Sequence, residues 1–140
     1  MFLHLLDADQ QQRFFEAARY VAAIDGVDER EEALLEAARI ETGLDALPPA
    51  PSSADEVLRK LHSVASPVVR NVFLLELAGF VVAGDESRER ELAFLEDCAE
   101  AVGASEEQLA TFKDFARRSF AFYRRGLDLI AESSESDEDA

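Results

Sequence analysis

The 140-residue chain has no tryptophan, one cysteine, four prolines and six glycines. Because Cys98 is alone, no disulfide can form within the chain, and a reducing cytoplasm is the simplest location. The opening MFLHLL is too short for a signal peptide, and no apolar run reaches the roughly 18 residues of a membrane-spanning helix. We therefore expect a cytoplasmic protein without direct membrane insertion.

Positive charge is also scarce, since 14 basic residues face 30 acidic ones and the net charge is −16. An acidic surface repels phosphate backbones and anionic lipids, so we expect no nucleic-acid partner and favour cations and protein partners. The chain contains no phosphate-binding glycine loop, no Ser-His-Asp signature and no Glu-x-x-His pair, and His4 and His62 are isolated. These absences predict a non-enzymatic protein without an organic cofactor.

Apolar residues recur at spacings of three and four, which predicts an all-α bundle of about six to seven helices. The predicted starts and ends are Asp7 to Ile24, Asp28 to Gly43, a short helix from Ser53, an apolar and central helix from Ser66-Pro67, Arg88 to Val102, and Ser105 to Ala131. We expect one domain over residues 1–131 and a disordered acidic tail over 132–140.

The sequence contains an internal repeat sixty residues apart. EAARYVAAIDGVDEREEALLEAARIETG, residues 16–43, aligns without gaps to ELAGFVVAGDESRERELAFLEDCAEAVG, residues 76–103, with twelve of twenty-eight positions identical. The identities keep an aspartate at the helix break and the closing glycine, which is hard to obtain by chance between two acidic helices. The repeat predicts two duplicated helix–loop–helix units.

Four of the duplicated acids extend apolar stripes. Asp25 and Asp85 follow the stripes of the first helix in each unit, and Glu31 and Glu91 precede the stripes of the second. If the units pack about a pseudo-two-fold axis, the four carboxylates converge at one end of the bundle, where they repel one another unless protons or a cation neutralise them. An alternative is that the aspartates are turn residues and the glutamates only cap helices.

The repeated pattern of apolar helix, Asp-Gly, polar residues, Glu and a second helix closed by glycine resembles the TerB-like tellurite-resistance family. The same fold occurs in membrane-anchored DnaJ-type co-chaperones. The resemblance covers residues 5–130, and its most specific part is AIDGVDEREEALLEAARIETGL. It implies a compact bundle of roughly seven helices, no known catalytic activity and a role in stress or chemical-resistance signalling.

The resemblance also implies an acidic site for a divalent cation between the repeats, with Asp25, Glu31, Asp85 and Glu91 as its ligands by position. Carboxylates favour Ca²⁺ or Mg²⁺, and Zn²⁺ less. The second unit reverses the family's Asp-Gly order, and the family's spacing would select Glu32 in place of Glu31. The arrangement is not an EF-hand, because glycine directly follows the first aspartate.

The run FKDFARRSFAFYRRGL interleaves aromatic residues with arginines on the last predicted helix. Such a pattern can indicate nucleic-acid binding, but on an acidic protein we expect a core-facing stripe beside solvated arginines. If the helix outruns the bundle, its end is a candidate surface for a homodimer. The sequence thus leaves two functions open: a cation-binding module of the stress response that acts through partner proteins, and a cation-independent interaction scaffold.

Overall fold

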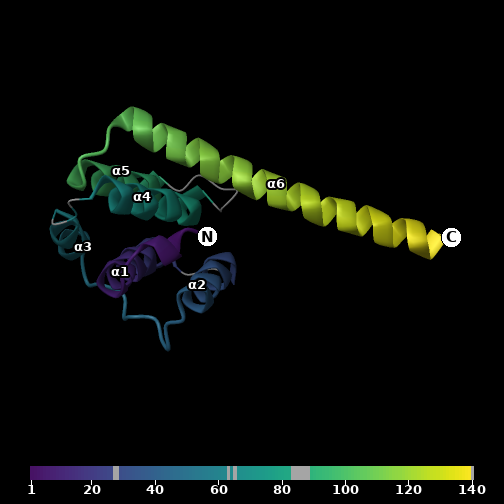
Figure 1. Ribbon diagram of the computed structural model, residues 1–140, viewed down its shortest axis with the longest axis horizontal. Coiled ribbons are helices and arrows are strands. Elements are labelled where there is room, and N and C mark those ends of the chain that lie inside the picture. Colours follow the sequence, from purple (N-terminus) through teal and green to yellow (C-terminus); the bar gives the residue numbers. More distant parts are fainter. Residues whose placement is uncertain (27–28, 63, 65, 83–88, 140) are drawn as a thin grey trace.

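The computed structural model of the chain describes residues 1–26, 29–62, 64, 66–82 and 89–139, with side chains as far as Glu132. All regular structure in these residues is helical, which confirms the predicted all-α class (Figure 1). The elements are the 3₁₀ helix η1 (Leu3–Leu5) and the α-helices α1 (Ala8–Ile24), α2 (Glu29–Thr42), α3 (Ala54–Leu61), α4 (Pro67–Val82), α5 (Glu89–Ala101) and α6 (Glu106–Asp139). None of the described helices has both the length and the apolar composition needed to cross a membrane.

Side-chain caps start two of the helices where the sequence predicted them. Asp7 accepts a hydrogen bond from the Gln10 backbone N–H at 2.9 Å, and the Asp7 N–H donates to the Gln10 side chain at 2.8 Å. Ser105 and Gln108 make the same reciprocal pair at the start of α6, at 3.1 and 2.9 Å. Each box satisfies backbone donors that the first helical turn leaves without partners.

Helix α3 starts at the predicted Ser53, but its capping box is only half formed. The Ser53 hydroxyl accepts from the Glu56 N–H at 3.3 Å, as expected. The Glu56 carboxylate, however, accepts from the N–H and hydroxyl of Ser52, one residue before the cap. Because the glutamate side chain is long, its carboxylate can reach Ser52 instead of the cap residue Ser53.

Glycines in the left-handed region end α2 and α5. Gly43 has φ +74° and Gly103 has φ +79°, values that residues with a Cβ adopt only under strain. After each glycine, the next backbone N–H reaches back to a carbonyl in the last turn, as in Leu44 to Arg39 at 3.2 Å and Ala104 to Ala99 at 2.9 Å. Both helix ends therefore match the prediction.

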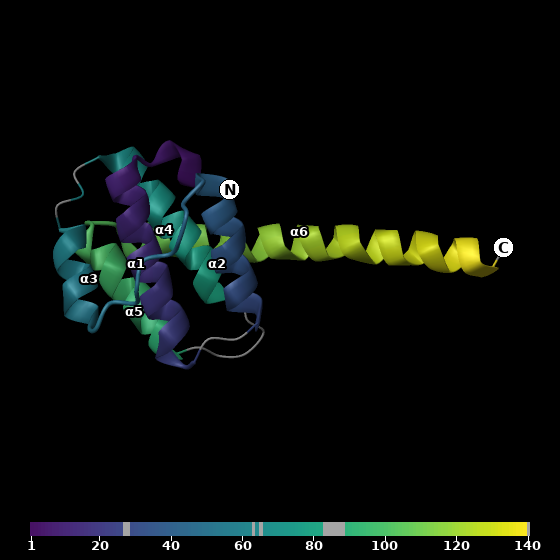
Figure 2. The ribbon, with the colours of Figure 1, turned by 90° about the horizontal axis from the view of Figure 1, so that it is seen from below.

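Helix α4 is the centre of the fold, as its apolar sequence predicted. It packs against α1, α5 and α6, so it lies in a middle layer between α6 and the α1–α2 side (Figures 1 and 2). Phe14 of α1 meets Phe73 and Phe80 of α4 edge-on, with ring centroids 5.7 and 5.9 Å apart. These contacts fill the core between the two helices that open the predicted units.

Helix α6 is longer than the sequence predicted. We expected it to end at about Ala131, but it continues to Asp139 and projects well beyond the bundle (Figures 1 and 2). The segment after Ala131 has no proline or glycine to end a helix, and serine and the acids carry only modest helix penalties. The first half of α6 is held by buried Leu109 and Ala116, whereas the second half extends from the bundle.

Candidate functional site

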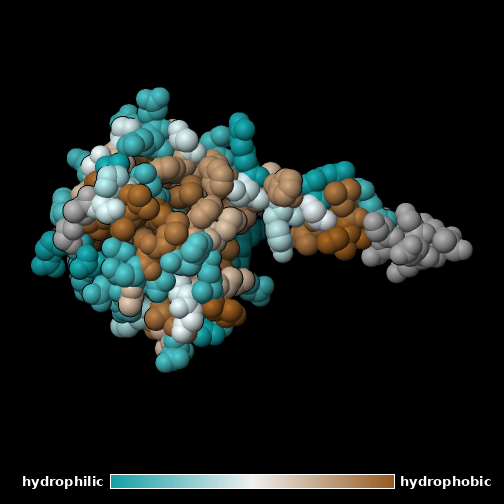
Figure 3. Space-filling view, viewed as in Figure 1, coloured by the Kyte–Doolittle hydropathy of each residue, from teal (hydrophilic) through white to brown (hydrophobic). Residues whose placement is uncertain are grey.

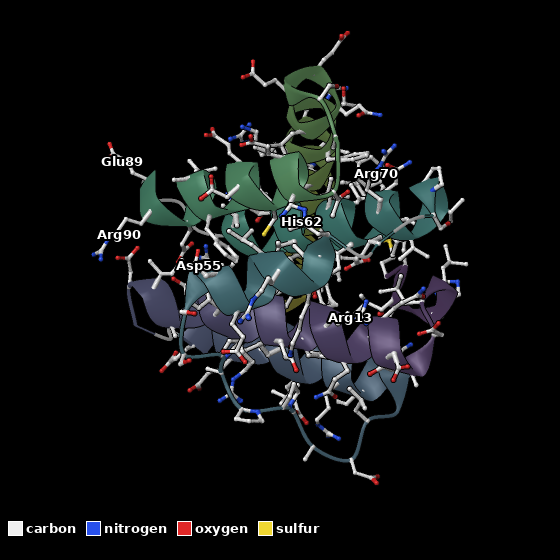
Figure 4. The ribbon with its side chains drawn as sticks, turned by 90° about the vertical axis from the view of Figure 1, so that its left-hand side faces the viewer. Arg13, Asp55, His62, Arg70, Glu89 and Arg90 are labelled. Atoms are coloured by element: carbon white, nitrogen blue, oxygen red, sulfur yellow. The ribbon has the colours of Figure 1, made fainter. Side chains whose placement is uncertain are left out.

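Asp25, the first of the four predicted ligands, lies at the end of the bundle where α1 stops and α5 begins. Asp25 is the C-terminal cap of α1, and Gly26, with φ +86°, turns the chain away from the helix. The Arg90 guanidinium in the first turn of α5 forms a salt bridge with Asp25, with Nη2 2.8 Å from Oδ1. Figure 4 shows Arg90 beside Glu89 at this end of the molecule. The contact joins the end of the first helix of one predicted unit to the start of the second helix of the other.

The environment of Asp25 differs from the prediction. We expected its side chain to prolong the buried stripe of α1, but it is 41% exposed, and its partner Arg90 is 76% exposed. At the C-terminal cap the chain has already left helical geometry, so the three-and-four spacing no longer sets the direction of the side chain. A pair this open contributes at most about 1 kcal/mol to stability.

Glu31 and Glu91 occupy matching places and are both buried, at 2% and 0% exposure. Each lies in the first turn of its helix, where the helix dipole favours a negative charge. Each also has an interaction partner in the fold. Burying an ionised carboxylate costs several kcal/mol unless other groups compensate it, so both carboxylates depend on their partners in the fold. The prediction that both lie on a buried face is confirmed.

The alternative ligand Glu32 is exposed, in contrast to Glu31. Two other duplicated acids, Glu29 and Glu36, also face outward, and Glu36 accepts two hydrogen bonds from Arg39 at 2.9 and 2.6 Å. The hydrogen bond from Arg39 holds the pKa of the Glu36 carboxyl below its ordinary value. The burial pattern therefore selects Glu31 as the inward acid of its helix.

The four predicted ligands are not gathered into one site within the described residues. Asp85 lies outside them. Among the side chains that the structure describes, no three histidine, cysteine, aspartate or glutamate residues come close enough to hold a metal ion together. Asp25 lies at the start of α5, where it contacts the guanidinium of Arg90, the residue immediately before Glu91.

A second set of charged contacts was not predicted from the sequence. Glu16 accepts from the Lys60 ammonium at 2.8 Å. Its counterpart Glu76 lies 3.1 Å from the amino group of Met1 and accepts from the Phe2 N–H at 2.7 Å. Both acids are less than 20% exposed on their side chains. The sequence does single out these two acids, because Glu16 and Glu76 are the first identical pair of the repeat.

The amino group of Met1 also binds Glu41 at 2.8 Å, so it joins α2 to α4. Partial burial of the amino group lowers its pKa by desolvation. The hydrogen bond to Glu41 and the charge of Glu76 outweigh this loss, and the pKa lies above its ordinary value of 8.0. The charged form of the amino group is therefore the one that the fold stabilises.

The aromatic-rich face of α6 differs most from the prediction. Phe112 packs against the core and Phe120 is half-buried, but Phe115 and Phe122 are 46% and 84% exposed. The prediction of a core-facing stripe is therefore wrong beyond the first turns. We define the α6 stripe as the apolar and small residues on one face of the projecting helix: Phe115, Ser119, Phe122, Tyr123, Gly126, Leu129 and Ile130.

The α6 stripe is continuous with a shallow groove beside the bundle. Phe115, Ser119 and Tyr123 of the stripe also line a pocket beside the bundle, together with Met1 and Phe80. Figure 3 shows hydrophobic surface on the projecting part of α6. Contiguous exposed apolar surface of this kind marks interaction sites in proteins.

No protein-family model, curated protein or solved structure matches this chain.

Proposed function

We propose that this protein is a non-enzymatic helical module, of the TerB-like kind that its sequence resembles, and that it acts by binding partner proteins through the α6 stripe. One observation supports this most directly: Phe122, Tyr123 and Ile130 are 84%, 68% and 66% exposed on a helix that leaves the bundle. Burying one such side chain contributes about 1.5–3 kcal/mol, so a partner that covers the stripe gains substantial free energy.

The biological setting of the proposal is the response to tellurite or another chemical stress, which the resemblance alone implies. Deleting the gene in its host should increase sensitivity to tellurite, and the unaltered gene should restore resistance. A Phe122→Asp variant should fold, because this side chain lies outside the core, but should fail to restore resistance. Full resistance with Phe122→Asp would contradict a role for the stripe.

The duplication is part of the same proposal. We infer that residues 16–43 and 76–103 are two copies of one unit. Each copy forms salt bridges with the other copy or with the segment that precedes the other copy. Asp25 of the first unit meets Arg90 of the second. Glu16 binds Lys60 from the segment before the second unit, and Glu76 binds the Met1 amine before the first. Contacts between α2 and η1 are matched by contacts between α5 and α3, which supports the same symmetry.

A second candidate function is cation binding at the junction of the units, through Asp25, Glu31, Asp85 and Glu91. The observation in its favour is that Glu31 and Glu91 are both buried in the first turns of matching helices. Oxygen-only ligands suit Ca²⁺ or Mg²⁺.

Calorimetry of chelator-treated protein with Ca²⁺, Mg²⁺ and Zn²⁺ tests the cation hypothesis. Binding should weaken in the Asp25→Asn, Asp85→Asn double variant and remain in Glu32→Gln, whose side chain is exposed. Absence of binding below millimolar ion would leave the cation-independent module as the function.

A further inference from the structure

The α6 stripe has a narrow middle and bulky edges. Ser119 and Gly126 are seven residues apart and share one line along the helix. Phe122 and Leu129 flank this line on one side, and Tyr123 and Ile130 flank it on the other. A Cβ placed on Gly126 would have no heavy atom within 4 Å, so the middle of the stripe is open. The small residues in the middle of the stripe leave room for the side chains of another helix to pack closely against it.

The glycine itself needs an explanation at this position. Glycine inside a helix costs about 1 kcal/mol relative to alanine. Within the described fold, nothing packs against Gly126 that would require the absence of a side chain. A second helix lying across the stripe would require it.

The charge pattern along α6 indicates which partner covers the stripe. From Lys113 to Arg125 five of the six charged residues are basic, whereas all six charged residues after Gly126 are acidic. The rest of the molecule is strongly acidic, with a net charge of −16 for the whole chain. Two copies of α6 placed antiparallel set the basic segment of each against the acidic segment of the other, while a parallel pair sets like charges together.

We propose that the α6 stripe is the interface of an antiparallel homodimer, with a two-fold axis between Leu127 and Asp128. In this register Gly126 faces Leu129 of the second copy, and Tyr123 faces Ile130 of the second copy. Arg125 lies beside Glu132 of the second copy. Within one chain these two side chains are 61% and 63% exposed and only 3.6 Å apart, so both point along the same flank of the stripe. This inference rests on the proposed function, because it names the partner that the stripe binds.

The first test measures the mass of the full chain by light scattering and sedimentation across micromolar concentrations. The unaltered protein should be a dimer. Ile130→Asp should weaken dimerisation by roughly 100-fold or more, because each interface loses two apolar contacts and buries two charges. Ile40→Asp is the matched control: Ile40 is 65% exposed on α2, close to the 66% of Ile130, and its replacement should leave the dimer intact.

The second test fixes the direction of the two helices. Arg125→Glu and Glu132→Arg should each weaken the dimer, because each brings like charges together across the two-fold axis. The chain with both reversals should regain most of the lost affinity. If the double variant is as weak as the single ones, the antiparallel register is wrong.

The outcomes separate this inference from the proposed function. A monomer at all concentrations, or a dimer that Ile40→Asp disrupts as strongly as Ile130→Asp, would overturn the homodimer. If the chain is monomeric and Phe122→Asp still abolishes tellurite resistance, the partner is another protein and the proposed function stands. If the dimer forms through the stripe but loss of the stripe leaves resistance unchanged, the inference holds and the proposed function fails.

Discussion

Cys98 shows how burial alone sets the chemistry of a side chain. The thiol is fully buried in α5, and desolvation, with a smaller contribution from the Asp97 charge, raises its pKa far above the ordinary value. Because the thiolate is the reactive form, we expect the native protein to resist a disulfide reagent at about pH 8 and the urea-unfolded protein to react fully. Rapid labelling of the native chain at a rate independent of unfolding would contradict the packing of α5.

The contact between Asp25 and Arg90 gives a second prediction at the residue scale. Both side chains are largely open to solvent, so a double-mutant cycle with Asp25→Asn and Arg90→Gln should give a coupling energy below about 1 kcal/mol that decreases with added salt. Urea unfolding of the four proteins measures it. A much larger coupling energy would mean that this contact fixes the positions of the two predicted units, rather than only bridging them at the surface.

At the scale of the element, the same substitution should have opposite effects at two glycines. Gly43 ends α2 with φ +74°, so Gly43→Ala should destabilise the fold by about 1 kcal/mol. Gly126 lies inside α6 with no positive φ and no close neighbour, so Gly126→Ala should stabilise the monomer by up to about 1 kcal/mol.

Both glycine substitutions are best compared by urea unfolding in the Ile130→Asp background, where the proposed dimer is absent. Gly103→Ala, at φ +79°, is the matched control for Gly43→Ala and should be destabilising as well. A stabilising Gly43→Ala would contradict the left-handed helix end. In the chain without Ile130→Asp, Gly126→Ala should weaken dimerisation even while it strengthens the helix.

Helix α6 also shows why a hydrophobic pattern does not reveal what the apolar face of a helix packs against. The three-and-four spacing correctly predicted a helix, since amphipathic periodicity is a local property of the sequence. Whether the apolar face meets the core or solvent depends on where the bundle ends, and the bundle ends within this helix. Phe112 and Phe122 belong to the same run of sequence, yet the first packs on the core and the second is exposed.

At the scale of the whole molecule, the Met1 amine links η1, α2 and α4 and makes stability depend on pH. Its folded-state pKa lies above 8.0, so its contribution is complete below that pH and is lost as the pH rises through the folded-state pKa. We expect acetylation of the amine to lower stability at about pH 7, by less than about 1 kcal/mol because the group is partly exposed.

The acetylated protein should also lose less stability between about pH 7 and pH 9.5 than the unmodified one, as measured by urea unfolding. The raised pKa of Cys98 adds a loss in the same direction, so the comparison belongs in a Cys98→Ala background. Equal pH dependence with and without the acetyl group would show that the amine does not contribute.

Features that depend on neighbours along the chain can be predicted from the sequence alone. The caps at Asp7 and Ser105, the helix ends at Gly43 and Gly103, and the inward direction of Glu31 and Glu91 follow from local hydrogen bonding and helical periodicity. These properties are set within one or two turns, so they can be predicted without knowing what packs on the helix.

The partners of these elements, in contrast, depend on how distant segments pack against one another. Asp25 binds Arg90 and Glu76 binds the Met1 amine, and both contacts join residues more than sixty positions apart. The same holds for α6, whose apolar face is buried near Ala116 and exposed at Phe122. Periodicity specifies a face, but packing of distant segments decides whether that face is covered by the chain itself or left for a partner.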